Sequence, residues 1–568
     1  MERLPIGISD YKELIEGGYY YVDKTLLVKE FMDTDGKILL VPRPRRFGKT
    51  LNLSMLRYFF DPCYAYPGLP AWQATQDREN KTRHLFADTA IWQKKEYREL
   101  QGTYPVIFLT FKGIKESTWN CAYEKFINII SREFERHKYL LEESMPSHTA
   151  EKYRSILERR ASRAIVESSL SFLAELLYNY HNKNVIILLD EYDVPIHAAY
   201  SKGYYQDMMD FIRPLLEDAF KDNTFLARGF ISGILRVAKE GVFTGLNNLK
   251  VCSFLNTEFQ DKFGFTESEV NLLLKDQKLT DKACEIKDWY NGYTCGSTKI
   301  YNPWSIVQCA DQRGLLKPYW VNTSDNAMVD KLIAYADEGV KRDLEALINH
   351  QSVTKEIDEG IVLSDLEYNE SSLWTLLMCT GYLSFAKQDL IEGITMCDLV
   401  VPNKEIKIVY NNLIKNIFQK SLTNTKITTL LKALTEGNSL KFGELFQEFV
   451  MNSMSFYDFS VKEPEKSYNL FVLGLLAYLS DTHEIKSNRE SGEGRYDIMI
   501  IPRQANMLAT VIEFKKVENK EKLEAACQRA LEQIKSKNYV RELKNRNMKK
   551  IQLLGIAFKG KKILVQVA

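Results

Sequence analysis

Residues 37–50 read KILLVPRPRRFGKT, and residues 51–60 read LNLSMLRYFF. An apolar run at 37–41 is followed by a tight loop, by Gly48-Lys49-Thr50 and by a helix-compatible stretch. This order of strand, loop and helix is the context that a P-loop requires. Because backbone N–H groups at the start of such a helix form a cradle for phosphate oxygens, the stretch predicts a phosphate-binding loop.

Four residues of this loop have predicted roles in binding a nucleotide. Lys49 would bridge the β- and γ-phosphates, and the hydroxyl of Thr50 would ligate Mg²⁺. Gly48 belongs to the backbone cradle, and Arg46 adds positive charge beside the phosphates.

Arg43 departs from the usual motif, which has a glycine five residues before Gly48. Arg43 adds positive charge to the loop, as does Arg45, but the missing glycine removes one close approach of the backbone to phosphate. A basic loop that caps an ordinary helix stays an alternative interpretation of this stretch.

A second motif lies at 185–191, where the apolar run VIILL leads directly into Asp190-Glu191. An acidic pair at the end of such a strand is typical of a Walker B motif. Asp190 would hold the hydration shell of Mg²⁺, and Glu191 would orient and polarise the attacking water as general base. A solvated strand end is the alternative, but two ordered motifs favour binding of ATP or GTP.

A third strand-like run, FLARGFIS at 225–232, ends at Ser232, a position for a polar sensor near the γ-phosphate. Arg236 and Asn247-Asn248 follow it, and ordinary loop hydrogen bonding is the alternative for all of them. Asp193 is either a supporting group behind the site or a helix cap.

The whole chain of 568 residues is predicted to have three parts. Apolar runs at 37–41, 105–111, 184–189 and 225–232, separated by helix-period segments such as 117–138 and 164–180, predict an α/β domain with a parallel sheet at 1–250. Residues 251–460 are predicted to be a mainly helical lid or connector. Residues 461–568 follow the order helix, strand, hairpin, helix, strand, typical of a second α/β domain.

The predicted hairpin pairs Arg495–Ile501 with Leu508–Lys515. Pairing Ile501 with Ala509 places Asp497 opposite Glu513, and Lys515 shares the face of Glu513 because side chains alternate along a strand. Facing carboxylates destabilise a sheet by up to about 1 kcal/mol, whereas a divalent cation turns their repulsion into coordination. The trio therefore predicts Asp497 and Glu513 as Mg²⁺ ligands, with Lys515 orienting water or neutralising phosphate. A half-exposed hairpin with a charged face is the alternative.

The surroundings of this hairpin are polar and basic. A glycine-rich loop is predicted at 487–495, able to approach a phosphate, and an apolar stripe predicts a helix at 523–534. Residues 511–568 contain 15 Lys or Arg against six Asp or Glu. Since the whole chain has 76 basic and 75 acidic residues, affinity for nucleic acid must come from such local patches.

The composition also indicates the compartment. The nine cysteines form no C-x-x-C pair, which argues against a zinc ribbon and against a secreted disulfide framework. The N-terminus lacks the apolar core of a signal peptide, and the longest apolar run, 470–479, is about half of a bilayer span. A cytoplasmic protein without membrane segments is therefore expected.

Several motifs resemble the bacterial AAA-ATPase-like family: VPRPRRFGKTLNLSML, VIILLDEYDVPI, GILRVAKEGVFTGLNNL, WYNGY, YNPWSI and YWVNTS. The segment SNRESGEGRYDIMI…VIEFKK…ALEQIKSKNY resembles the PD-(D/E)xK nuclease-superfamily domain found at the C-terminus of those proteins. The resemblance implies a P-loop ATPase fold that uses ATP and Mg²⁺, with the arginine at 43 as a family variation.

In the nuclease part, the resemblance maps Asp497, Glu513 and Lys515 onto metal and catalytic positions. It also suggests Glu490 as a further acidic ligand and Gln533 as the helical glutamine of related nucleases. Tyr468-Asn469 departs from a Tyr-His pair that relatives often carry, which puts a histidine-assisted role there in doubt.

Together these features predict an ATP-dependent enzyme that cleaves nucleic acid, with DNA favoured and with Glu191, Asp497, Glu513 and Lys515 as catalytic residues. The ATPase domain is a candidate surface for a homo-oligomer. One alternative is a nucleotide-switched regulatory or scaffold protein whose nuclease-like domain only binds nucleic acid. Another is an ATPase that acts on a protein partner through aromatic residues of the middle region, namely Trp289, Tyr293, Trp304 and Trp320.

Overall fold

The computed structural model describes residues 2–65, 80–142, 145–236, 248–320, 338–360, 369–456, 464–491, 494–518 and 521–568. The chain divides into two compact units. The first consists of Met1–Ser324 with Ser352–Glu405, and the second of Asp325–Gln351 with Ile406–Ala568. The domain boundaries at 250 and 460 stay predictions.

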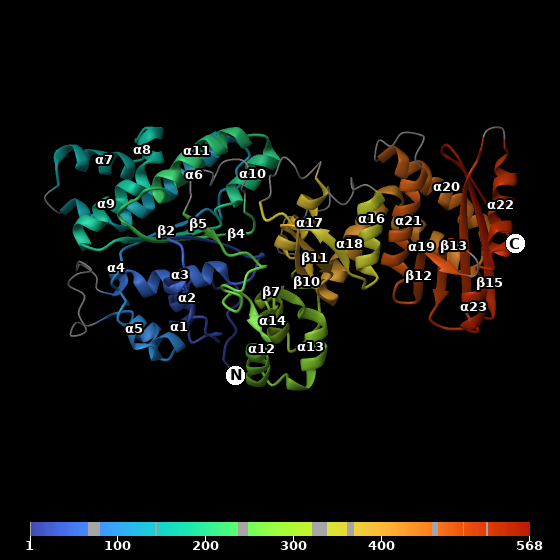
Figure 1. Ribbon diagram of the computed structural model, residues 1–568, viewed down its shortest axis with the longest axis horizontal. Helices are drawn as coiled ribbons and strands as arrows, with labels where there is room; N and C mark the ends of the chain where they lie inside the picture. Colours follow the sequence, from blue (N-terminus) through green and yellow to red (C-terminus); the bar gives the residue numbers. More distant parts are fainter. Residues whose placement is uncertain are drawn as a thin grey trace. The chain divides into compact units, whose positions relative to one another are not determined.

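A five-stranded parallel sheet forms the centre of the first unit (Figure 1). Its strands, in the order β2-β3-β4-β1-β5, are β2 (Val106–Thr110), β3 (Val185–Asp190), β4 (Leu226–Gly233), β1 (Ile38–Pro42) and β5 (Leu249–Val251). The four predicted apolar strands and their parallel arrangement are confirmed. All six residues of β3 are buried, as expected for a strand covered on both faces.

Helices cover both faces of this sheet (Figure 1). One face carries α1 (Tyr11–Glu16), α2 (Leu27–Asp33) and α3 (Lys49–Phe60), and the other carries α6 (Trp119–Arg136), α9 (Ser169–His181), α10 (Val194–Lys202) and α11 (Tyr205–Phe220). The other described helices of this part are α4 (Pro62–Ala65), α5 (Lys95–Arg98), α7 (Ser147–Leu157), α8 (Arg163–Glu167), η2 (Arg83–Leu85), η3 (Ala90–Gln93) and η4 (Lys138–Glu142). Because the strands are parallel, their carboxyl ends meet at one edge, where β1 leads into α3.

The rest of the first unit is a mixed region after β5. Its helices are α12 (Glu267–Asp276), η5 (Thr280–Lys282), α13 (Ala283–Tyr290), α14 (Pro303–Asp311) and α17 (Glu370–Thr380). Its strands form two three-stranded antiparallel sheets: β6 (Phe265–Thr266), β8 (Thr298–Tyr301) and β7 (Tyr293–Cys295); and β10 (Ser384–Ile391), β11 (Ile394–Val400) and β9 (Val353–Glu356). The middle of the chain is mainly helical as predicted, but the periodicity did not predict these small sheets. Most of their strands are too short to show an alternation of apolar and polar residues. β10 is longer, but most of its residues are exposed.

The aromatic motifs of this region contribute to its core. Tyr293 and Trp320 are both 1% exposed, and the ring of Tyr293 lies 5.2 Å from the ring of Phe47, at the P-loop. Trp289 and Trp304 are half-buried. For Tyr293 and Trp320 this favours core packing over an exposed surface for a protein partner.

Glu405 is a fully buried carboxylate in the first turn of α18 (Lys404–Ser421). Its oxygens accept hydrogen bonds from the backbone N–H of Trp320 and from the hydroxyl of Ser305, both at 2.8 Å. Burial raises the pKa of Glu405 to about 7, and these two hydrogen bonds only partly oppose the shift. The folded chain therefore keeps this proton at a pH where the unfolded chain has lost it.

We predict that Glu405→Gln stabilises the first unit at pH 8 but not at pH 5. The folded pKa lies above the unfolded value, so stability falls as pH rises from about 4.5 to about 7, by about 3 kcal/mol in total. Glutamine avoids this loss, because Ser305 can accept from its amide. The melting temperature at pH 8 should rise by about 3 °C or more. An equal change at both pH values, or the same change in the exposed control Glu436→Gln, would contradict the assignment.

The second unit contains a five-stranded mixed sheet in chain order (Figure 1). Its strands are β12 (His483–Ser491), β13 (Gly494–Pro502), β14 (Leu508–Lys516), β15 (Lys550–Lys559) and β16 (Lys562–Val567), with β14 and β15 parallel and the other pairs antiparallel. Helices α22 (Leu523–Ser536) and α23 (Arg541–Asn545) lie on one side, and α19 (Asn424–Glu436), α20 (Ser439–Phe456) and α21 (Pro464–Leu479) on the other; α16 (Glu338–Ile348) contacts α21. The predicted helix at 523–534 and the predicted hairpin are confirmed.

The predicted register of the hairpin is also confirmed. Ile498 pairs with Ile512, and Ile500 with Thr510, which is the register that places Asp497 opposite Glu513. The predicted loop at 487–495 is wrong, however, because β12 extends to Ser491 and pairs with β13 as far as Gly494. The sequence of the last five residues of β12, SNRES at 487–491, is polar throughout, so no alternation of apolar and polar residues indicated a strand.

Candidate functional site

The P-loop joins β1 to α3 at the carboxyl edge of the parallel sheet. Gly48 caps α3 with a left-handed backbone, φ +83°, which glycine adopts without steric cost. Arg46 has φ +69°, a conformation that is uncommon for a residue with a side chain. Two left-handed residues, Arg46 and Gly48, therefore stand on either side of Phe47 just before the helix begins at Lys49.

Lys49 is buried inside this loop, with 5% of its surface exposed. Its ammonium donates hydrogen bonds to the carbonyl oxygens of Arg43 at 2.8 Å and Pro44 at 3.0 Å. Burial lowers the pKa of Lys49, and the nearby Glu191 carboxylate opposes this shift most strongly. The lysine is thus held by the loop that is predicted to hold the phosphates.

Arg43 does not serve the loop in the way that the sequence suggests. Its side chain is fully buried, and its guanidinium donates to the carbonyl oxygens of Pro42 and Cys252, both at 2.8 Å, and of Glu258 and Phe259 at 3.2 and 3.4 Å. The prediction that Arg43 adds positive charge for phosphate is therefore wrong. The arginine ties the P-loop to the segment after β5, where a glycine would leave these carbonyls without a donor.

We predict that Arg43→Gly destabilises the chain, although it restores the usual P-loop glycine. The variant loses four hydrogen bonds and the contacts of the guanidinium with the rings of Phe254 and Phe263, 5.4 and 5.5 Å away. The expected loss is about 3–5 kcal/mol. Thermal melting checks it, with the half-buried Arg45→Gly as control. Equal melting temperatures for Arg43→Gly and wild type would contradict the structural role.

Asp190 connects three elements at the carboxyl edge of the sheet. Its carboxylate accepts hydrogen bonds from the hydroxyls of Thr50 at 2.9 Å and Ser232 at 2.7 Å. The hydroxyl of Thr110, at the end of β2, donates to the same carboxylate at 3.3 Å. The sequence motifs predicted the first three residues; Thr110 was missed, although it is the polar residue within the predicted apolar strand at 105–111.

Glu191 follows β3 directly, in a strained left-handed conformation with φ +52°. Its backbone N–H donates to the hydroxyl of Ser232 at 3.4 Å, which joins β3 to β4. Burial raises the pKa of the Glu191 carboxyl, and Lys49 opposes the shift. A carboxylate with a raised pKa at a strained position is suited to accept a proton.

Asp193 is a supporting group behind this edge. It is fully buried, and one oxygen accepts from the backbone N–H groups of Ile234 at 2.7 Å and Leu235 at 3.1 Å. Burial raises the pKa of Asp193, but His197 and these N–H groups outweigh it, so the pKa lies below its usual value. Since its side chain makes no capping bond to α10, the structure favours the supporting role over the helix cap.

Aromatic and amide side chains of the YNPW motif contact the P-loop. The guanidinium of Arg46 lies 4.4 Å from the ring centroid of Trp304, a cation–π contact. The amide of Asn302, which also caps α14, donates to the carbonyl of Arg45 at 3.5 Å. This motif therefore supports the loop from the region after the parallel sheet.

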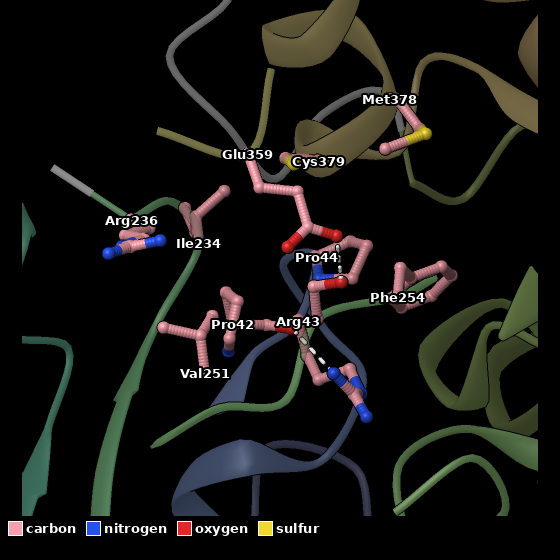
Figure 2. A pocket seen from close by; sticks show the side chains of 11 residues that line it. Pro42, Arg43, Pro44, Ile234, Arg236, Val251, Phe254, Glu359, Met378 and Cys379 are labelled. Carbon is pink, nitrogen blue, oxygen red and sulfur yellow. Dashed lines mark hydrogen bonds between the residues drawn. The ribbon is translucent and has the colours of Figure 1, made fainter. Parts of the chain in front are cut away.

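A pocket borders the start of the P-loop (Figure 2). Figure 2 shows Pro44 of the loop, Arg236 beyond β4 and Glu359 around it, and Glu359 accepts a hydrogen bond from the hydroxyl of Ser253 at 2.6 Å. Arg236, which follows the predicted sensor Ser232, thus lines the same pocket as the loop. Of the other two residues predicted nearby, Asn248 is exposed and Asn247 lies outside the described residues.

The second candidate site lies on the β13–β14 hairpin. Asp497 accepts a hydrogen bond from the backbone N–H of Phe514 at 2.6 Å, and Lys515 donates to Glu513 Oε1 at 3.0 Å. Glu513 is 2% exposed, and its buried Oε2 has no hydrogen-bond partner in the described part of the chain. The hairpin therefore brings two carboxylates and one ammonium together, as the register predicts.

In this trio, burial makes ionisation of the two carboxyl groups unfavourable. Burial raises the pKa of Glu513 to about 7, with the charge of Asp497 as the second cause and Lys515 opposing. Burial also raises the pKa of Asp497. Two buried acids that resist ionising together form a site that a cation would stabilise.

Comparison with known protein families matches both ends of the chain. Residues 5–243 match the family described as "Predicted AAA-ATPase", and residues 463–567 match the "PD-(D/E)XK nuclease superfamily". The chain carries an AAA-ATPase-like domain followed by a PD-(D/E)XK nuclease-superfamily domain. A relative from Azotobacter chroococcum mcd 1, named "Uncharacterized protein in vnfD 5'region", is 24% identical over 574 residues, which cover 98% of this chain and 96% of the relative.

The oxygen atoms of the AAA-ATPase-like domain fit Mg²⁺. The hydroxyl of Thr50 and the carboxylate of Asp190 are hard oxygen donors, 2.9 Å apart, and Mg²⁺ prefers one or two such groups with phosphate oxygens and water. The nuclease-superfamily domain fits a divalent metal through the unpartnered Oε2 of Glu513. Among the residues with described positions, no group of three or more His, Cys, Asp or Glu is arranged to hold a metal, so water or phosphate would complete each shell.

The weaker candidates of the nuclease-superfamily domain have different outcomes. The amide of Gln533, on α22, donates to the hydroxyl of Tyr539 at 3.0 Å, and burial raises the pKa of Tyr539, with Glu513 and Asp497 adding to the shift. Gln533 thus bonds a tyrosine whose pKa the two carboxylates raise, and no motif in the sequence pointed to this tyrosine. Glu490 lies on β12, and the backbone of 468–469 lies on α21, but their side chains fall outside the described residues.

None of the described helices combines the length and the apolar character that crossing a bilayer takes.

Proposed function

We propose that the AAA-ATPase-like domain binds and hydrolyses ATP with Mg²⁺, and that the nuclease-superfamily domain uses a divalent metal to hydrolyse phosphodiester bonds in nucleic acid, with DNA as the favoured substrate. The observation that carries the proposal is the buried Glu513, which has a raised pKa and an oxygen without a hydrogen-bond partner in the described part of the chain. Asp497 raises this pKa further, and Lys515 donates a hydrogen bond to the other oxygen. Cytoplasmic location and a homo-oligomer stay predictions.

In the ATPase part, the proposed roles follow from the side-chain atoms that face one another at the P-loop. Lys49 would exchange its two carbonyl partners for phosphate oxygens, a stronger charge-assisted contact. Thr50 and Asp190 would hold Mg²⁺, which when bound neutralises charge on the phosphates. Ser232 would keep Asp190 oriented, and Glu191 would accept the proton of the attacking water.

Gly48 and Arg46 support phosphate binding from the loop itself. The left-handed turn at Gly48 directs the first N–H groups of α3 toward the loop, where an anion would bind. Arg46, whose guanidinium lies 4.4 Å from the ring centroid of Trp304, would add positive charge beside the phosphates.

In the nuclease part, Asp497 and Glu513 would share a divalent metal that, when bound, lowers the pKa of a water molecule. Lys515 is 3.0 Å from Glu513 and carries the positive charge needed beside a phosphodiester. The N–H of Phe514 keeps Asp497 in place from the neighbouring strand. Asp497 and Glu513 would thus bind the metal, and Lys515 would neutralise the phosphate.

Coupling between the two activities is supported by contacts behind the P-loop. Trp304 on α14 stacks on Arg46, and the next residue, Ser305, donates to Glu405 at 2.8 Å. Glu405 is in the first turn of α18, whose residues from Ile406 onward belong to the second unit. A shift of the P-loop on binding ATP would therefore act on the start of this helix.

Metal binding to the full chain tests both parts of the proposal. Electron paramagnetic resonance of Mn²⁺ should detect a bound ion without nucleotide, at the Asp497–Glu513 pair, and a further ion when ATP is added. A chain that binds no Mn²⁺ without ATP would contradict the nuclease part. A chain that gains no further ion with ATP would contradict the ATPase part. If metal binds but the wild-type chain does not cleave nucleic acid, the nuclease-like domain only binds nucleic acid, and the scaffold alternative holds.

A further inference from the structure

The second unit contains a pocket that shares no lining residue with the Asp497–Glu513 pair. It has a volume of about 390 Å³, within the range of small-molecule sites. Residues 349–351 beyond α16, Lys407 of α18, the start of β12 and Arg503 after β13 line it. Arg503 is six residues from Asp497 along an extended strand, which corresponds to about 20 Å.

Two cations of this pocket have no carboxylate partner among the described residues. The ammonium of Lys407 donates to His350 Nε2 at 2.9 Å, and the guanidinium of Arg503 donates to the carbonyl of Ser480 at 3.0 Å. Because His350 accepts this bond through a ring lone pair, it is neutral and leaves the charge of Lys407 uncompensated.

The other two charged residues that line the pocket are neutralised. Lys486 forms an ion pair with Glu542, and Glu484 forms one with Arg546 at 2.6 Å. The lining therefore keeps the positive charge of Lys407 and Arg503. Burial lowers the pKa of Lys407, and Arg503 lowers it further, while Asp481 opposes the shift without forming an ion pair. The two cations are thus close enough to repel each other.

His483 supplies an unpartnered polar atom to the same pocket. Its side chain is 3% exposed, and Nδ1 lies 2.8 Å from the hydroxyl of Thr482. Its buried Nε2 has no hydrogen-bond partner in the described part of the chain. A buried polar atom without a partner costs stability unless a ligand or water satisfies it.

From these observations we propose that the pocket binds a phosphate group, carried by a nucleic-acid strand or by a free phosphate compound. Lys407 and Arg503 supply the charge, and His483 Nε2 supplies a hydrogen-bonding atom. Phosphate suits this set because it carries negative charge and several acceptor oxygens at once. The binding does not require cleavage, so it can be tested without a divalent metal.

Binding of a labelled DNA oligonucleotide to the full chain in EDTA tests the nucleic-acid source. Lys407→Gln and Arg503→Gln should each weaken binding about tenfold and reduce the slope of log affinity against log salt by about 1. Arg503→Lys keeps the charge and should bind within about threefold of wild type. The control Lys432→Gln, an exposed residue of α19, removes one charge away from the pocket and should change affinity less than about twofold.

Thermal melting with inorganic phosphate tests the other source. Measured in a Lys49→Ala background, which lacks the P-loop lysine, phosphate should raise the melting temperature, and Arg503→Gln should remove the increase. If only this arm responds, the proposal holds with a free phosphate compound as the ligand. If neither DNA affinity nor the effect of phosphate depends on Lys407 and Arg503, in variants that melt like the control, the proposal is wrong.

Discussion

Replacing Glu513 by Gln is expected to slow Mg²⁺-dependent cleavage of nucleic acid by about 100-fold or more. The substitution keeps the shape of the side chain but removes the charge of a carboxylate that is 2% exposed and has an unpartnered oxygen. An amide is a weaker ligand for a hard cation, so metal affinity and cleavage rate should fall together. Cleavage of end-labelled DNA under single-turnover conditions measures the effect.

The matched control is Glu518→Gln, which removes the same charge from an exposed residue just after β14. Its side chain is 76% exposed, so its cleavage rate should stay within about twofold of wild type. Equal rates for Glu513→Gln and Glu518→Gln would exclude Glu513 as a metal ligand. Raising the Mg²⁺ concentration should recover part of the activity of Glu513→Gln, because the first defect is in metal affinity.

Lys49→Ala is expected to weaken ATP binding by about 100-fold or more. The lysine carries the ammonium of the P-loop and is buried among loop carbonyls, so its loss removes a charge-assisted contact to the phosphates. Titration of the full chain with a fluorescent ATP analogue in Mg²⁺ measures the loss. The exposed Lys12→Ala serves as the control for removing a charge.

Substitutions of Thr50 distinguish, in the same assay, the contribution of Mg²⁺ to ATP affinity from that of the phosphate contacts. Thr50→Val keeps the shape but removes the hydroxyl that donates to Asp190, whereas Thr50→Ser keeps the hydroxyl. ATP affinity in Mg²⁺ should fall in Thr50→Val and be retained in Thr50→Ser, and the difference should vanish in EDTA. Equal affinities of the two variants in Mg²⁺ would argue against Thr50 as a metal ligand.

Much of the fold was predictable because the deciding elements are buried on both faces. β1 and most of β3 are continuous apolar runs, and the residues at the carboxyl ends of such strands meet at one edge by the geometry of a parallel sheet. The hairpin register was predictable because side chains alternate strictly along a strand, which leaves only one way to bury its apolar residues and pair Asp497 with Glu513.

The rest depended on contacts between segments far apart in the chain. The burial of Arg43 is decided by carbonyl groups of Cys252 and Glu258, more than 200 residues away. The strand at 487–491 is decided by its partner β13, and the buried Glu405 by Ser305 and the backbone of Trp320. No local pattern carries such information, so a basic loop before Gly48 and a polar loop at 487–495 were the natural expectations.

The coupling of ATP to cleavage is the central claim, and one measurement tests it most directly. The cleavage rate of the full chain on DNA in Mg²⁺ is compared with and without ATP, in wild type and in Lys49→Ala. We predict that ATP changes the wild-type rate, and that Lys49→Ala cleaves at a single rate whether or not ATP is present. A wild-type rate that is the same with and without ATP would contradict the account.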